Sequence, residues 1–169
     1  ISCEMAKIYP NLNVYSYEAN PHIFKYLESN IKDNDLCNRI NTFNLALSDK
    51  DDDVLHLQYH DSNSGGSTAC LQNRDLVNHK KVHVNTISLN TVLSKFDKVD
   101  VLKIDCEGYE YKILYNTDTD QLKKIDCIIG EFHINKYLES DGYNMESLRT
   151  FLIKLGIKVD VVFCNMANY

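Results

Sequence analysis

Two classes of partner are disfavoured by what this 169-residue sequence lacks. It contains no apolar run close to the roughly 20 residues that a membrane-spanning helix requires. Its lysines and arginines form no cluster, and 24 acidic residues against 18 basic ones give a net charge of −6. A protein that binds nucleic acid usually carries a basic patch. We therefore expect neither a membrane nor a nucleic acid as partner.

The cysteines also lack a pattern, since no two of them form a C-x-x-C pair. They are spread along the chain at positions 3, 37, 70, 106, 127 and 164. Cys106, Cys127 and Cys164 lie in apolar runs, which favours reduced, buried thiols over a disulfide framework or a zinc site. Such thiols are typical of a reducing compartment, so we predict a cytoplasmic protein.

Strand and helix patterns alternate along the chain, and 44% hydrophobic residues are enough for one core. Alternating or continuous apolar runs predict strands at 13–18, 39–47, 54–60, 99–106, 124–133 and 157–163. Helical spacing predicts helices at 21–34, 107–117 and 144–156 (Asn144 as cap), and residues 83–96 combine a strand with a short helix that Ser88 or Asn90 caps. The sequence thus predicts one α/β domain over residues 1–169, with a doubly wound, mostly parallel sheet and helices on both faces.

Two further segments are informative. Ile1, Met5 and Ile8 are spaced as on one helix face that Pro10 ends. The sequence begins inside this pattern without a cap, so we expect the chain to be truncated at its N-terminus. Residues 59–76, which include "DSNSGGSTAC", read as a polar and neutral loop.

Polar side chains directly follow several of the predicted strands. In open α/β sheets, ligands bind outside the carboxyl ends of the strands. Glu18 ends the strand predicted at 13–18, where a carboxylate can accept hydrogen bonds from both ribose hydroxyls of a nucleotide cofactor. It can equally be a solvated acid that interacts with the dipole of the next helix. Glu18 alone does not decide between these interpretations.

The stretch "VDVLKIDCEGYE" (99–110) places three carboxylates around one glycine. Glu107 and Glu110 fit the first turn of a helix, where acidic residues interact favourably with the helix dipole. Asp105 ends the strand before that helix begins, so this explanation does not cover it. Three carboxylates at one junction must face solvent, a cation or a ligand, because burying them unpaired is costly.

His133 is the last residue of the next predicted strand, 124–133, and lies two residues after Glu131. Residues i and i+2 of a strand share a face, so we expect both side chains to point the same way. A histidine beside carboxylates titrates near neutrality and can act as a general base. A structural histidine at a strand end is the alternative interpretation.

Two segments, "VYSYEANP" (14–21) and "LKIDCEGYEYKIL" (102–114), resemble the FkbM family of S-adenosylmethionine-dependent methyltransferases. The order of the elements between them and the later "EFH" (131–133) are also similar to that family. The resemblance implies a class I methyltransferase fold, which is Rossmann-like, and O-methylation of a hydroxyl on a sugar or other small molecule. It implies that the cofactor S-adenosylmethionine is bound by Glu18, Ala19, Ala46, Leu47, Asp105 and Glu107, with Glu18 on the ribose and Ala46 near the adenine.

For methyl transfer, we predict that Asp105 or His133 takes the proton of the acceptor hydroxyl and that Glu131 orients His133. The sequence requires no metal, and a divalent ion held by Asp105 and Glu107 stays an alternative. The small-molecule hydroxyl acceptor is not identified by the sequence.

The sequence departs from the family at both ends. The glycine-rich cofactor loop of the family would precede residue 1, and its last antiparallel strand would follow Phe163. We therefore expect truncation at the N-terminus and at the C-terminus, and self-association through the sheet edge that a lost strand would expose. Two alternatives stay open: a non-catalytic methyltransferase-like remnant, and a nicotinamide-dependent oxidoreductase. The second is disfavoured because no tyrosine has a lysine four residues later, as the short-chain dehydrogenase pair requires.

Overall fold

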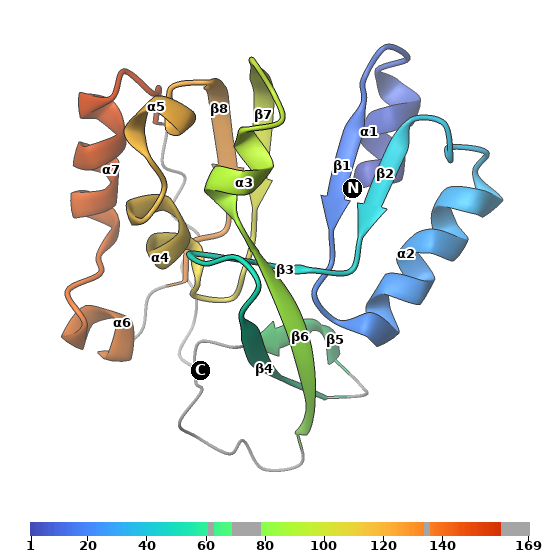
Figure 1. The fold of residues 1–169 in the computed structure, drawn as a ribbon, viewed down its shortest axis with the longest axis horizontal. Coiled ribbons are helices and arrows are strands. Elements are labelled where there is room, and N and C mark those ends of the chain that lie inside the picture. The colour runs from blue at the N-terminus through green and yellow to red at the C-terminus, as the bar shows by residue number, and fades with distance from the viewer. Residues whose placement is uncertain (61–62, 69–78, 134–135, 160–169) are drawn as a thin grey trace.

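The computed structural model describes residues 1–60, 63–68, 79–133 and 136–159, and these form a mixed α/β fold (Figure 1). The strands are β1 (Val14–Tyr17), β2 (Ile40–Phe43), β3 (Ala46–Ser48), β4 (Val54–His60), β5 (Asn63–Thr68), β6 (Lys80–Ser88), β7 (Val99–Ile104) and β8 (Ile125–Gly130). The helices are α1 (Ser2–Ile8), α2 (Pro21–Asp33), α3 (Leu89–Leu93), α4 (Glu110–Tyr115), α5 (Thr119–Leu122), α6 (Lys136–Ser140) and α7 (Met145–Lys154). The predicted α/β class is confirmed.

The strands do not form the single sheet that the sequence predicts. In the described part of the chain, β1 pairs with β2, β7 pairs with β8, and a separate sheet has the order β3-β6-β4-β5. The pairs β1–β2, β7–β8 and β3–β6 are parallel, whereas β4 is antiparallel to β5 and β6. Figure 1 shows the β7–β8 pair near the middle of the molecule and the β1–β2 pair to its right, with β4, β5 and β6 below both.

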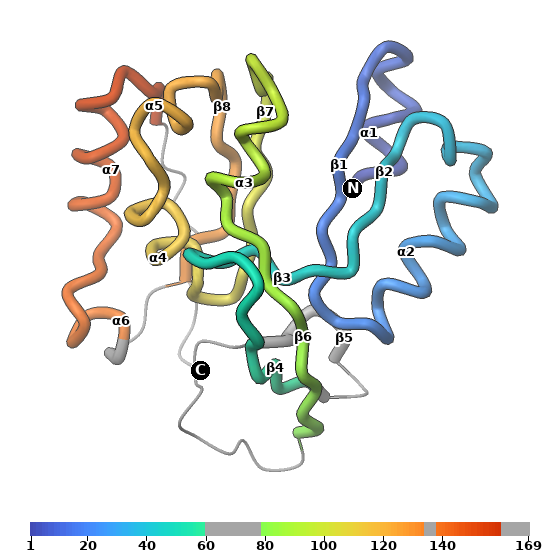
Figure 2. The backbone as a smooth tube through the Cα atoms, viewed as in Figure 1, coloured from blue at the N-terminus to red at the C-terminus, as the bar shows by residue number. Residues whose placement is uncertain are grey.

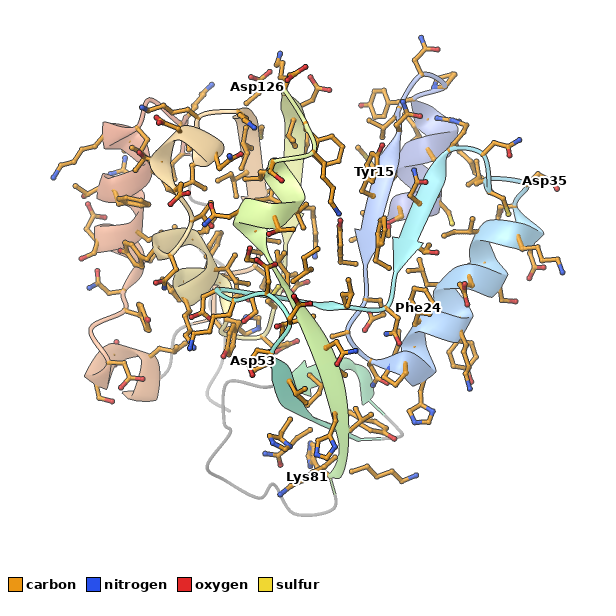
Figure 3. All side chains as sticks on the ribbon, in the orientation of Figure 1. Tyr15, Phe24, Asp35, Asp53, Lys81 and Asp126 are labelled. Carbon is orange, nitrogen blue, oxygen red and sulfur yellow. The ribbon has the colours of Figure 1, made fainter. Side chains whose placement is uncertain are left out.

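Within the described residues, no strand is hydrogen-bonded between the β1–β2 pair and the β7–β8 pair, and side chains connect them. The Tyr15 ring meets the Phe96 ring edge-on, with 4.7 Å between centroids. Figure 3 shows Tyr15 on the side of β1 that faces β7. On β2, Phe43 stacks on Tyr17 at the same centroid separation. The Tyr15–Phe96 contact therefore packs the β1–β2 pair against the segment that leads into β7, and the Tyr17–Phe43 contact packs within the β1–β2 pair.

The run 39–47, predicted as one strand, forms two. β2 continues beside β1 as far as Phe43, and β3 then pairs with β6 instead. Figure 2 shows the chain leaving β2 and crossing the molecule as β3. At the break, the side-chain amide of Asn44 donates hydrogen bonds to the carbonyl oxygens of Glu18 and Ala19, which ties the end of β2 to the end of β1.

The N-terminal helix forms as predicted, but its buried face is different. Ile1 and Ile8 are 74% and 65% exposed, and Met5 is exposed as well. Ala6 is the residue of α1 that is fully buried, and it packs in a small core with Ile31 of α2. The spacing of the large apolar residues therefore predicted the helix correctly and its packing face wrongly.

Other predictions fall partly outside the described residues. Within the polar loop predicted at 59–76, Asn63–Thr68 is strand β5, so the loop prediction is wrong there, and 61–62 and 69–76 are not described. In the final strand predicted at 157–163, residues 157–159 have no strand structure, and 160–163 are not described. The caps Ser88 and Asn144 are confirmed, since their side chains accept hydrogen bonds from the N–H groups of Thr91 and Ser147.

The described cysteines, Cys3, Cys37, Cys106 and Cys127, are free, which agrees with reduced thiols. Cys37 is exposed, whereas Cys106 and Cys127, which the apolar runs predict to be buried, are partly buried, and burial raises the pKa of the Cys106 thiol to about 12. Cys70 and Cys164 lie outside the described residues. Among the described helices, none has both the length and the apolar composition needed to cross a bilayer.

Asp51 fixes the start of α3 to the turn before β4. Its carboxylate accepts hydrogen bonds from the backbone N–H of Ser88 at 2.8 Å, from the Ser88 hydroxyl at 2.9 Å and from the Thr91 hydroxyl at 2.7 Å. The bond from the Ser88 N–H is the main reason why the pKa of Asp51 lies below its usual range. Ionised Asp51 therefore stabilises the folded state.

We expect Asp51→Asn to lower the free energy of unfolding by about 1 kcal/mol at pH 7, because hydrogen bonds to the ionised carboxylate are lost. Because the pKa of Asp51 is lowered in the folded state, its stabilising effect is complete above the unfolded-state pKa of about 3.9. The effect is lost as the pH falls through the folded-state pKa. Urea unfolding between pH 7 and pH 3 should show the two proteins converging at acid pH. Asp120→Asn, at an exposed position of α5, is the control, and an equal effect there would contradict the assignment.

Candidate active site

The site begins where β7 ends, at Asp105 and Cys106. The two next residues, Glu107 and Gly108, have positive φ angles of 51° and 99°. Glycine adopts this backbone region without a penalty, whereas a residue with a Cβ at such an angle costs about 1 kcal/mol. The resulting tight turn leads directly into α4.

Glu110, the first residue of α4, is fully buried. Its carboxylate accepts hydrogen bonds from the backbone N–H groups of Cys106 at 2.7 Å and Gly108 at 2.9 Å. The sequence-based interpretation, a first-turn acid placed for the helix dipole, is therefore incomplete. In the sequence, the signal for this role is the position of Glu110 two residues after Gly108. From there its carboxylate can accept a hydrogen bond from the glycine N–H across the turn.

Gly130 brings the end of β8 close to the end of β7. A Cβ at this position would lie 2.7 Å from the Ile104 carbonyl oxygen, a separation that real Cβ atoms essentially never show. The pairing of Ile104 with Gly130 continues through the hydrogen bond from the Glu131 N–H to the Ile104 carbonyl. Residues 131–133 consequently leave β8 beside the turn that follows β7.

His133 contacts a carboxylate through each ring nitrogen. Nδ1 lies 3.4 Å from Glu110 Oε1, and Nε2 lies 3.2 Å from Glu107 Oε2. The hydrogen bond with Glu110 is the main cause that raises the pKa of His133, against the opposing effect of burial. The pKa of Glu107 is raised too, because burial and the neighbouring carboxylates outweigh the effect of His133.

Glu131 does not take the position that the sequence suggests. β8 ends at Gly130, so the rule that residues i and i+2 of a strand share a face does not apply to Glu131 and His133. Glu131 is exposed, and the carboxylates in contact with His133 are those of Glu107 and Glu110. The expectation that Glu131 orients His133 is corrected accordingly.

Asp105 completes a group of three side chains with Glu107 and His133. One ligand atom from each of these residues lies within 4.8 Å of the others. A carboxylate oxygen of Asp105 also lies 2.6 Å from the Lys103 ammonium group. We call Asp105, Glu107 and His133 the strand-end triad, and a cation or a hydroxyl compound is the kind of ligand that its donors suit.

The other predicted residues lie outside this triad. Glu18 follows β1, is half-buried, and accepts a hydrogen bond from the Asn20 N–H at 2.8 Å. Burial is the main reason why its pKa is raised. Ala19 and Leu47 are partly buried against the main core, and Ala46 is buried within that core.

We expect the pKa of His133 to lie above 6.5, its ordinary value, and to fall in Glu107→Gln, because one of the two carboxyl groups that raise it is removed. NMR titration of the imidazole signals in the presence of EDTA measures both values. Glu28→Gln, on the exposed face of α2, is the control. A His133 pKa at or below 6.5 in the unmodified protein would contradict this geometry.

Comparison with known protein families identifies the family of this chain. Residues 4–159 match the family described as "Methyltransferase FkbM domain". No curated protein and no solved structure gives a significant match to the chain. The matched region contains Glu18, the strand-end triad and Glu110, and it covers most of the sequence. The chain therefore belongs to the FkbM family of methyltransferases.

Proposed function

We propose that this protein transfers a methyl group from S-adenosylmethionine to a hydroxyl oxygen of a sugar or another small molecule. Membership of the FkbM family supports methyl transfer. The observation that supports a hydroxyl acceptor is the strand-end triad, which places an imidazole nitrogen and two carboxylates at the adjacent ends of two parallel strands. This arrangement suits proton removal from a hydroxyl.

The end of β1 suits the ribose of the cofactor. Glu18 is half-buried there, its backbone is fixed by the bond from its N–H to the Phe43 carbonyl, and its side chain is positioned by Asn20. A carboxylate held in this way can accept hydrogen bonds from two adjacent hydroxyls. Ala19 lies next to it, and the proposal assigns Ala46 and Leu47 to the adenine side. We also propose that the chain has the class I fold of methyltransferases.

The chain's own residues supply binding and proton transfer. S-adenosylmethionine supplies a methyl group on a positively charged sulfur, and the carboxylates of Asp105 and Glu107 favour a cation nearby. The acceptor oxygen forms a bond to the methyl carbon as the carbon–sulfur bond breaks, and the bonding electrons stay on sulfur. The hydroxyl proton passes to Asp105 or to Nε2 of His133, which Glu110 orients through Nδ1.

We expect S-adenosylhomocysteine, the product of this reaction, to bind with a micromolar dissociation constant in calorimetric titration. Glu18→Ala should weaken binding at least tenfold, because hydrogen bonds to a charged group contribute about 1.5 to 3 kcal/mol. Glu28→Ala, which removes an exposed acid from α2, is the matched control and should bind as the unmodified protein does.

Other outcomes favour other functions. Binding of NADH in place of S-adenosylhomocysteine would favour a nicotinamide-dependent oxidoreductase. Binding of neither ligand would contradict the proposal and favour a non-catalytic methyltransferase-like protein. Equal weakening by Glu18→Ala and Glu28→Ala would remove Glu18 from the cofactor site.

A further inference from the structure

We propose that Asp105, Glu107 and His133 bind a divalent transition-metal ion, with Mn²⁺ and Zn²⁺ as the best-suited ions. The three ligands come from the end of β7, from the turn before α4 and from the segment after β8. The proposal concerns metal binding by this chain alone, and it does not depend on the cofactor or on methyl transfer.

The donor atoms are spaced for one shared ion. Ligands at about 2.1 Å from a metal lie roughly 3.0 to 3.4 Å apart when they are adjacent. Nε2 of His133 and Oε2 of Glu107 are 3.2 Å apart. All three residues offer a donor within 4.8 Å of the others, so a small side-chain rotation of Asp105 brings the set into coordination distance.

The histidine is held as metal-binding histidines usually are. Such a residue presents one ring nitrogen to the metal and donates the other N–H to a carboxylate, which fixes the tautomer and the ring orientation. Here Nδ1 of His133 contacts Glu110, and Glu110 is itself fully buried and hydrogen-bonded to the backbone. This leaves Nε2 directed toward Glu107, which is the side on which the metal would lie.

The charges around the triad also favour a cation. Asp105, Glu107, Glu110 and the exposed Glu131 belong to the same two strand ends, and Lys103 is the cation paired with Asp105. The Lys103 side chain is 40% exposed, so its ammonium group can move into solvent when a metal arrives. Lys103 therefore competes with the metal for Asp105.

The donor set narrows the choice of ion. Mg²⁺ and Ca²⁺ prefer oxygen ligands alone, whereas imidazole nitrogen suits zinc and other transition metals. Two carboxylates with one imidazole match Mn²⁺ and Zn²⁺ better than either alkaline-earth ion. With a metal bound, His133 and Asp105 are ligands and not bases. If the proposed function holds, the metal would polarise the acceptor hydroxyl, and water would accept its proton.

The test is Mn²⁺ binding to the EDTA-treated and dialysed full chain, measured by the loss of the free-ion electron paramagnetic resonance signal. We expect one strong site per chain, which Zn²⁺ displaces and Mg²⁺ does not. Pulsed measurements on the bound ion should show coupling to an imidazole nitrogen. Neither cofactor nor acceptor is present, so failure of the methyltransferase proposal would leave this result unaffected.

Matched variants assign the site. Asp105→Asn, Glu107→Gln and His133→Gln should each weaken binding by about tenfold or more, and His133→Gln should abolish the nitrogen coupling. Lys103→Met should strengthen binding because it removes the competing cation. Asp126→Asn and Lys98→Met are the controls: these two residues form an ion pair at the opposite end of the β7–β8 pair, where Figure 3 shows Asp126, and should leave the affinity unchanged.

Circular dichroism and thermal unfolding confirm that each variant is folded before its affinity is compared. The proposal is overturned if the unmodified chain binds no Mn²⁺ below millimolar concentration. It is equally overturned if a folded variant of the triad binds as tightly as the unmodified chain, or if the bound ion shows no nitrogen coupling.

Discussion

The buried carboxylate of Glu110 is the group on which the geometry of this site depends. It accepts hydrogen bonds from two backbone N–H groups of the turn after β7 and contacts Nδ1 of His133 from the segment after β8. A fully buried carboxylate is stable only when such donors replace its hydration. The Glu110 side chain thus joins the turn after β7 to the segment after β8. The parallel pairing of β7 and β8 by itself only brings these two segments near each other.

The rest of the site follows from this constraint. The turn that Glu110 stabilises has positive φ angles at Glu107 and Gly108, and it projects the Glu107 side chain toward His133. Gly130 allows the close approach of the two strand ends, which no larger residue permits without a shift of the backbone. Asp105, directly after β7, then lies within reach of both partners. The imidazole and the two carboxylates are therefore preorganised by backbone geometry, which reduces the cost of holding a ligand.

Much of the local structure was predictable because its causes are local. The caps Ser88 and Asn144 and the Pro21 start of α2 are short-range signals, and the strands that end at Glu18 and Asp105 are marked by apolar runs. The split of 39–47 was not predictable, because it depends on which strands β2 and β3 pair with. The packing of α1 was missed for a similar reason, since Ala6 is buried by distant residues.

The same distinction applies to the site. Asp105 and His133 stand out in the sequence because they follow apolar strands. The partners of His133 do not stand out in the sequence, because they depend on where β8 ends and on how the turn after β7 folds. Sequence spacing therefore favoured Glu131, whereas the three-dimensional contacts are made by Glu107 and Glu110. Glu110 resembles an ordinary first-turn glutamate until its burial is known.

The most direct test of this account is the Glu110→Gln variant, studied by chemical unfolding and by NMR of the His133 imidazole. Glutamine has nearly the same shape, but its NH₂ group would face a backbone N–H, so one of the two N–H donors of the turn loses its acceptor. The account predicts a loss of about 2 kcal/mol in the free energy of unfolding and a lowered His133 pKa. Unchanged stability together with an unchanged His133 titration would contradict it.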